Sequence, residues 1–153
     1  MVADLLIQIA EAMAQELNIA QAENSAIFSR QFVAERVYDY TRTLEETTTL
    51  RVDVVPEKHE DEPLTRSSWK GTGIVSIAVR EKIKAEDTEA IDALTAFVGE
   101  LRDFWTLPVR KLALFPAAAP IKRQIVYPYL QKELRTHGQF VSVLQLTFNL
   151  VSQ

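Results

Sequence analysis

The stretch that decides the fold is Gln139-Phe-Val-Ser-Val-Leu-Gln-Leu-Thr-Phe-Asn-Leu-Val151. Side chains at every second position of a strand share a face. One face therefore carries Phe140, Ser142, Leu144, Leu146, Phe148 and Leu150, and the other carries Val141, Val143, Gln145, Thr147, Asn149 and Val151. A strand of about twelve residues is roughly twice the usual length. Because neither face carries a charge, we predict that this stretch is the central strand of a sheet.

Two segments have the three- and four-residue spacing of amphipathic helices. The first covers residues 3–17, with Asn18 as the expected end. The second begins at Asp87 or Thr88, which can cap the helix, and Pro108 lies just past its end. The apolar stripes are Leu5, Leu6, Ile9, Ala10, Met13 and Leu17 in the first helix, and Ile91, Leu94, Phe97, Val98, Leu101, Phe104 and Trp105 in the second.

Shorter segments at residues 32–40, 50–56, 72–80 and 121–127 are rich in residues that favour strands. We expect the first two to pair as an antiparallel hairpin, with Pro56 ending the ladder or lying at a sheet edge. Residues 128–138 are expected to hold a helical turn, and residues 112–120 receive no assignment. Residues 57–71 show no periodicity, so we predict a long polar loop there.

The predicted order is therefore α-β-β-β-α-β-β within one domain, residues 1–153. This order indicates an α+β fold, with a mixed, largely antiparallel sheet of about five strands and two main helices on one face. The opposite face would then expose Val141, Val143 and Val151 to water. A monomer rarely leaves such a surface open, so we expect a second copy, or neighbours in a ring, to cover it.

Composition sets broad limits on the function. The chain has 153 residues, a net charge of −4 and no cysteine, which excludes disulfides and thiolate chemistry and fits a reducing cytoplasm. The N-terminus lacks a basic region, and no apolar run approaches eighteen residues, so we expect a soluble protein without signal peptide or membrane span. The mild acidic charge does not predict specific nucleic-acid binding.

No catalytic constellation is found. His59 lies among four carboxylates that could gather around a hard cation, but their spacing matches no calcium loop. The segment Lys70-Gly-Thr-Gly73 is neither a P-loop nor a dinucleotide motif. The Glu-x-Lys or Asp-x-Lys pattern of metal-dependent nucleases does not occur in the sequence. We therefore predict a protein that is not an enzyme and has no cofactor and no metal site.

Four stretches together resemble the small structural proteins that phages and prophages encode to complete or terminate a tail. They are residues 50–56 (Leu-Arg-Val-Asp-Val-Val-Pro), residues 77–83 (Ile-Ala-Val-Arg-Glu-Lys-Ile), residues 89–94 (Glu-Ala-Ile-Asp-Ala-Leu) and residues 139–148 (Gln-Phe-Val-Ser-Val-Leu-Gln-Leu-Thr-Phe). The similarity extends over most of the chain in the order of its elements.

The resemblance implies a minor tail protein of the tail-terminator kind, located in the virion tail and assembled in the cytoplasm of the bacterial host. It implies a homo-oligomeric ring, often a hexamer, that contacts the tail tube protein and a head-side connector protein and contributes to head–tail joining. Trp69, in a polar segment, is either an anchor folded back on its own domain or a hot spot for a neighbour. The candidate oligomer-interface residues are Glu60, Asp61, Glu62, Arg66, Trp69, Val141 and Val143.

Two alternatives stay open at this point. One is a cytoplasmic metal-dependent enzyme that uses the acidic segment around His59. The other is a small module that binds a host protein, which would be a monomer with an exposed apolar patch.

Overall fold

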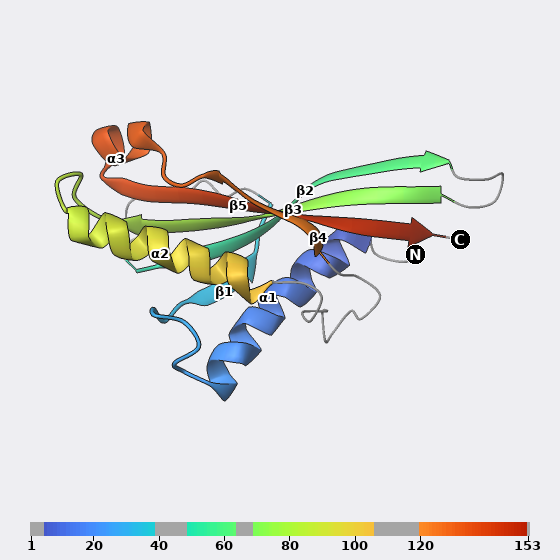
Figure 1. The fold of residues 1–153 in the computed structure, drawn as a ribbon, viewed down its shortest axis with the longest axis horizontal. Helices are drawn as coiled ribbons and strands as arrows, with labels where there is room; N and C mark the ends of the chain where they lie inside the picture. The colour runs from blue at the N-terminus through green and yellow to red at the C-terminus, as the bar shows by residue number, and fades with distance from the viewer. Residues whose placement is uncertain (1–4, 39–48, 64–68, 106–119, 153) are drawn as a thin grey trace.

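The computed structural model describes residues 5–38, 49–63, 69–105 and 120–152. These residues form one five-stranded sheet with helices packed on it (Figure 1). The elements in chain order are α1 (Leu5–Glu23), β1 (Val33–Arg36), β2 (Arg51–Pro63), β3 (Trp69–Lys82), α2 (Thr88–Phe104), β4 (Pro120–Tyr127), α3 (Gln131–His137) and β5 (Gln139–Ser152). The predicted α+β class is confirmed, and α3 is the helical turn expected in residues 128–138.

The sheet has the strand order β1-β2-β3-β5-β4. The β1–β2 pair is parallel, and the other three pairs are antiparallel. The sheet is therefore mixed and largely antiparallel, as predicted. The closing strand β5 lies inside the sheet between β3 and β4, but β3 holds the central position. The prediction that residues 139–151 form the central strand is thus wrong by one place.

The expected antiparallel hairpin of the first two strands is also wrong, because β1 and β2 run side by side in the same direction. Val33 pairs with Arg51, and Arg36 pairs with Val54. A parallel pair needs a connection of a dozen or more residues that returns the chain to the same end of the sheet. The segment between Arg36 and Arg51 is long enough for this return, and its residues 39–48 lie outside the described part.

Helix α1 continues to Glu23 instead of ending at Asn18. The Asn18 side chain contacts β1: its amide donates to the Ala34 carbonyl and its oxygen accepts from the Ala34 N–H, both at 2.9 Å. The polar residue that seemed to end the helix therefore fastens α1 to the edge strand. None of the helices described here has the length and apolar content needed to cross a membrane.

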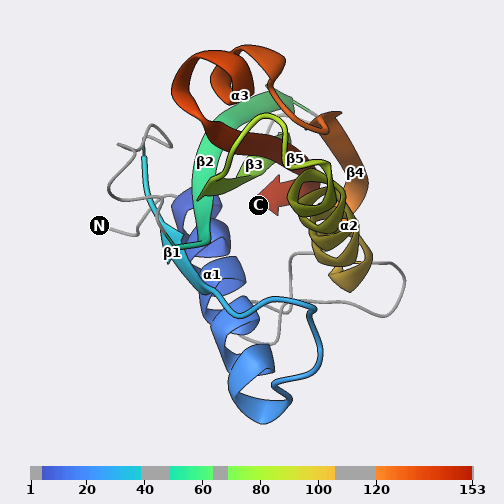
Figure 2. The same ribbon diagram turned by 90° about the vertical axis from the view of Figure 1, so that its left-hand side faces the viewer.

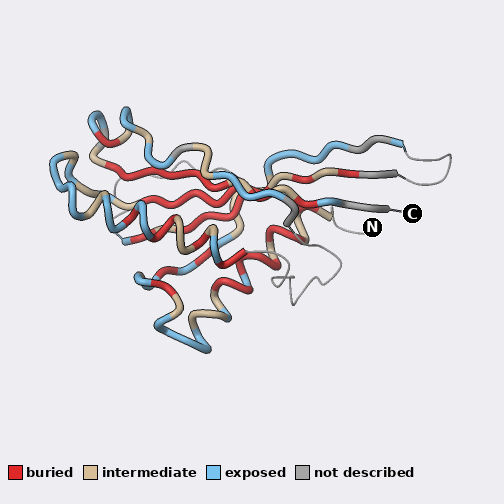
Figure 3. The backbone as a smooth tube through the Cα atoms, in the orientation of Figure 1, coloured by how far each residue is buried: buried red, intermediate tan, exposed pale blue. Residues whose placement is uncertain are grey.

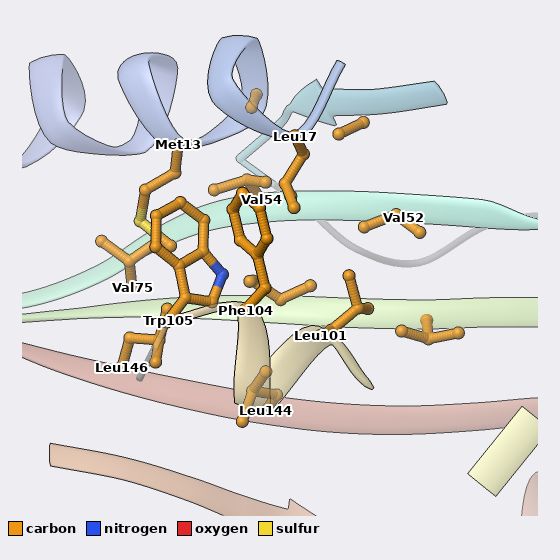
Figure 4. Packing of buried hydrophobic residues seen from close by; sticks show 14 of the residues in the cluster. Met13, Leu17, Val52, Val54, Val75, Leu101, Phe104, Trp105, Leu144 and Leu146 are labelled. Atoms are coloured by element: carbon orange, nitrogen blue, oxygen red, sulfur yellow. The ribbon is translucent and has the colours of Figure 1, made fainter. Parts of the chain in front are cut away.

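The main core lies between one face of the sheet and helices α1 and α2, which Figure 2 shows below the sheet. Figure 4 shows Met13 and Leu17 of α1 pointing toward Phe104 and Trp105 at the end of α2. The apolar residues alternate along β5, so Phe140, Leu144, Leu146 and Phe148 belong to this core and are fully buried. The face of β5 that was predicted to be core is confirmed.

The opposite face of the sheet is covered in part by α3, which packs on β5 (Figures 1 and 2). The Leu130 N–H donates to the Val141 carbonyl at 3.0 Å, and Leu134 of α3 is buried. Val141 and Val143 are 0% and 4% exposed within the single chain. The expectation that they are left open to water is therefore wrong, because the short segment before β5 folds back as a third layer.

Candidate functional site

The most unusual feature is a three-stranded extension, which we call the arm. It consists of residues 57–63 of β2, 69–73 of β3 and 148–152 of β5, and it projects beyond α2 and α3 (Figure 1). Three strands that are covered by helices in the body of the molecule thus continue past α2 and α3, although Phe148 at the base of the arm is still buried. Figure 3 shows residues of β2 changing from buried to exposed along this path.

Both outer edges of the arm are open within the described residues. On one side, β1 pairs with β2 only from Arg51 to Val54. On the other side, the pairing of β4 with β5 begins at Phe148 and runs back into the body. Edge strands present unpaired backbone N–H and C=O groups, which bind water or another chain. Each open edge is therefore a position where a further strand can pair.

A β-bulge marks the point where β2 leaves the body. Pro56 pairs with Val75 and Lys58 pairs with Ile74, so Glu57 is an extra residue on β2. A bulge exchanges the two faces of the strand beyond it and increases the local twist. After the bulge, β2 continues in regular register, with His59 opposite Gly73. The arm is therefore an ordered ladder and not a loop.

The β2 edge of the arm is acidic. Residues 57–62 contain Glu57, Glu60, Asp61 and Glu62 against the single lysine Lys58. The side chains of residues 57–60 are exposed. Lys58 Nζ lies 2.6 Å from Glu60 Oε1, and Gln145 Nε2 donates to Glu57 Oε2 at 2.9 Å. Charges on an edge strand discourage pairing with an identical edge.

The opposite edge of the sheet, β4, is basic. Residues 120–127 contain Lys122 and Arg123 and no acidic residue, and both side chains are exposed. Arg123 Nη1 donates to the Arg102 carbonyl at 3.0 Å and lies 3.8 Å from Asp103 Oδ1. Arg123 is thus tied to the end of α2, while its neighbour Lys122 lies on the open edge. The two edges of one sheet carry opposite charge.

The predicted polar loop at residues 57–71 is wrong for the residues that the structure describes, because they belong to β2 and β3. Glu60, Asp61 and Glu62 continue β2, and Trp69 begins β3 opposite Pro63 and Ser152. Arg66 lies outside the described residues. The sequence reading missed the arm because charged residues replace the apolar ones that normally mark a strand. The signal available was the strand-like Lys70-Gly-Thr-Gly73 continuing into residues 74–80.

The structure also bears on the metal-site alternative. Among the residues that the structure describes, no group of three or more histidines, cysteines and carboxylates is placed to hold a metal ion. Successive positions on a strand face opposite sides of the sheet. The strand conformation therefore places neighbouring side chains, such as those of His59 and Glu60, on opposite sides of the sheet.

A hollow with a volume of about 480 Å³ lies between α2 and α3. Its lining mixes Ile91 and Leu134 with Asp92 and Arg135. These side chains form no nucleophile–base pair, so the hollow offers no recognisable chemistry.

One ion pair with shifted pKa values joins α1 to β1. Arg36 Nε lies 2.7 Å from Glu11 Oε2. This hydrogen bond, with a further one from Gln15, lowers the pKa of Glu11 below its ordinary value of 4.5. The same bond to Glu11 and a contact with the Tyr38 hydroxyl raise the pKa of Arg36. The pair fastens the first helix to the edge strand and has a structural role.

No protein-family model matches the sequence, and no curated protein matches it either. Among solved structures, the chain is similar to the sheath/tube terminator of an extracellular contractile injection system, PVC, determined by cryo-EM in its extended state. The TM-score is 0.46 and the sequence identity 15%, and the match covers 100% of this chain and 58% of the other. The chain thus spans little more than half the length of that protein.

Proposed function

We propose that the chain is a non-enzymatic structural subunit that completes a phage or prophage tail as part of a homo-oligomeric ring. The observation that carries this proposal is the arm, with its two open strand edges. The body buries its own core between the sheet and its helices. The arm, in contrast, leaves backbone groups of β2 and β5 without a described partner strand. A body that buries its own core and an arm with open strand edges are what we expect of a subunit that contacts its neighbours through extended strands.

The tail assignment comes from the sequence resemblance. In this role the ring, often a hexamer in such proteins, sits on the last ring of the tail tube protein and stops its growth. Its other side meets a head-side connector protein, which joins the tail to the head. Assembly takes place in the cytoplasm of the bacterial host, and the finished ring is part of the virion tail.

Within the ring, the arm supplies the candidate contacts. Glu60, Asp61 and Glu62 lie on its acidic edge strand, and Trp69 begins the strand beside it. Arg66 falls between these two strands in the sequence. Val141 and Val143 are buried in the body, so they shape the sheet that carries the arm and offer no free surface.

Two measurements test the proposal. Light scattering on the purified chain at micromolar concentration, with negative-stain electron microscopy, should show closed rings. Co-expression with its cognate tail tube protein should then shorten the tubes to a narrow length distribution. A chain that remains a monomer and leaves tube length unchanged would refute the proposal.

A further inference from the structure

We infer that the acidic outer edge of β2 in the arm of one copy pairs with the basic outer edge of β4 in the next copy. The sheet then continues from subunit to subunit. The inference rests on the proposed ring, and it names the two surfaces that meet in it. The occupant of the arm's β2 edge is thus a second copy of this chain.

The first step is the direction of the backbone. Strands β2 and β5 are both antiparallel to β3, so they run parallel to each other. Strand β4 is antiparallel to β5 and hence to β2. Two copies placed side by side in the same orientation bring β2 of one against β4 of the other as an antiparallel pair. Antiparallel pairs have straight, perpendicular hydrogen bonds and suit this kind of addition.

The second step is the space along each edge. Strand β1 pairs with the outer edge of β2 as far as Val54, where the Val37 N–H donates to the Val54 carbonyl at 2.9 Å. Among the described residues, the open part of β2 therefore covers residues 55–63. Strand β4 has 8 residues, from Pro120 to Tyr127, and pairs only with β5 in the described part of the chain. The two open edges have matching lengths.

The third step is charge, which decides which edges meet. Two β2 edges would place the exposed carboxylates of Glu57 and Glu60 near those of the other copy, and two β4 edges would do the same with Lys122 and Arg123. Like charges directly opposite each other destabilise a strand pair, and opposite charges stabilise it. Pairing β2 with β4 is the combination that brings acidic against basic residues. The symmetric dimers are disfavoured for the same reason.

The fourth step is the symmetry of the assembly. A contact between two different surfaces is heterologous, so every copy still has one free edge of each kind after it pairs. Such a contact closes into a ring when the rotation between copies permits. Opposite charge on the two edges of one sheet therefore favours a heterologous contact, the kind that a ring needs.

Charge reversal on each edge gives a paired test. The arm variant is E60K/D61K/E62K, and the edge variant is K122E/R123E. Each variant alone should associate at least tenfold more weakly than the wild type in sedimentation velocity. A mixture of the two should assemble again, because each variant then supplies the edge that the other needs. The matched control K132E/R135E reverses two exposed charges of α3 and should assemble like the wild type.

Disulfide trapping tests the contact without reversing charges. The wild-type chain has no cysteine, so Gln124→Cys combined in turn with Lys58→Cys, Glu60→Cys or Glu62→Cys gives no background. Within one chain β3 and β5 separate β2 from β4, a spacing of roughly 14 Å, and a disulfide needs Cα atoms within about 7 Å. Any disulfide must therefore join two copies. The pair Glu60→Cys with Lys132→Cys serves as the control.

The outcomes separate the two proposals. Reassembly in the mixture together with trapped oligomers supports the pairing, provided that each variant melts within a few degrees of the wild type. Wild-type rings that survive both reversals, or that give no trapped oligomer at any of the three positions, would overturn the pairing and leave the ring intact. A wild-type chain that is a monomer would overturn the ring itself.

Discussion

A substitution at the buried residue Val143 distinguishes a role in folding from a role in assembly. It is 4% exposed on the face of the sheet that α3 partly covers. The substitution Val143→Asp would bury a carboxylate, which has a large desolvation cost. We expect the free energy of unfolding in urea to fall by about 3 kcal/mol or more.

The control for this substitution is Val33→Asp on the edge strand β1, where the side chain is 69% exposed. Its unfolding free energy should change by less than about 0.5 kcal/mol. A V143D protein that stays folded but no longer assembles would place Val143 at a subunit contact instead.

Asp87, one of the two caps that the sequence offers, caps the second helix. Its side chain accepts a hydrogen bond from the Ala90 N–H at 3.1 Å and so satisfies one of the free donors of the first turn. Asp87→Ala should lower the free energy of unfolding by about 1 kcal/mol, which thermal denaturation measures as a lower melting temperature. The neighbouring Glu86→Ala, which removes an exposed side chain before the cap, should leave the melting temperature nearly unchanged.

The Glu11–Arg36 pair predicts a pH dependence of known sign. The pKa of Glu11 is lowered in the folded protein, so the pair stabilises the fold above the ordinary value of 4.5 and loses this effect as the pH falls through the lowered value. The Glu11 side chain is 46% exposed, which limits the contribution to less than about 1 kcal/mol. Glu11→Gln should therefore be slightly less stable than the wild type at pH 7, and the difference should disappear as the pH falls through the lowered pKa of Glu11. If the stability difference persists at low pH, it comes from side-chain packing and not from the ion pair.

At the scale of the elements, the arm should be separable from the body. The variant replaces residues 61–71 with Asn-Gly, which joins the paired residues Glu60 and Thr72 by a two-residue hairpin. Because the deletion removes none of the core residues, we expect a folded protein with near-normal far-UV circular dichroism. Its self-association by light scattering should be lost. If the shortened chain still forms rings, the arm tip is not needed for assembly.

The elements also show which structures the sequence could predict. Helix α2 and strand β5 were predictable because their apolar residues repeat at the period of their own structure. The arm was not, because its strands are held by backbone pairing between β2 and β3 and carry charge where a strand usually carries apolar side chains. The direction of β1 was missed because local alternation identifies a strand but says nothing of the path that leads to the next one.

For the whole molecule, a charge-driven contact predicts a dependence on salt. The Debye length falls from about 30 Å at 0.01 M to about 3 Å at 1 M. If the acidic and basic edges hold the subunits together, the association constant should fall about tenfold or more over this range. Sedimentation velocity across a salt series checks this. Association that is constant or strengthened at high salt would point to apolar contacts.

The function was less predictable than the fold. A protein without a catalytic constellation leaves no residue pattern that names its chemistry, and an assembly surface becomes visible only when the strands are paired. The sequence predicts that Glu60, Asp61 and Glu62 lie in a polar loop suited to reaching a neighbour. The structure places all three residues on β2, the outer strand of the arm. Val141 and Val143 were chosen for a face that the chain partly covers by itself.

The unbroken course of the strands has a mechanical consequence. Strands β3 and β5, of 14 residues each, run from under the helices to the far end of the arm, and no hinge divides the two parts. A force that pulls on the arm along its length acts parallel to the strands. It is then shared by many hydrogen bonds of the β3–β5 ladder at once, in shear. A pull on the arm along its length would therefore reach the core of the subunit directly, without first bending a flexible joint.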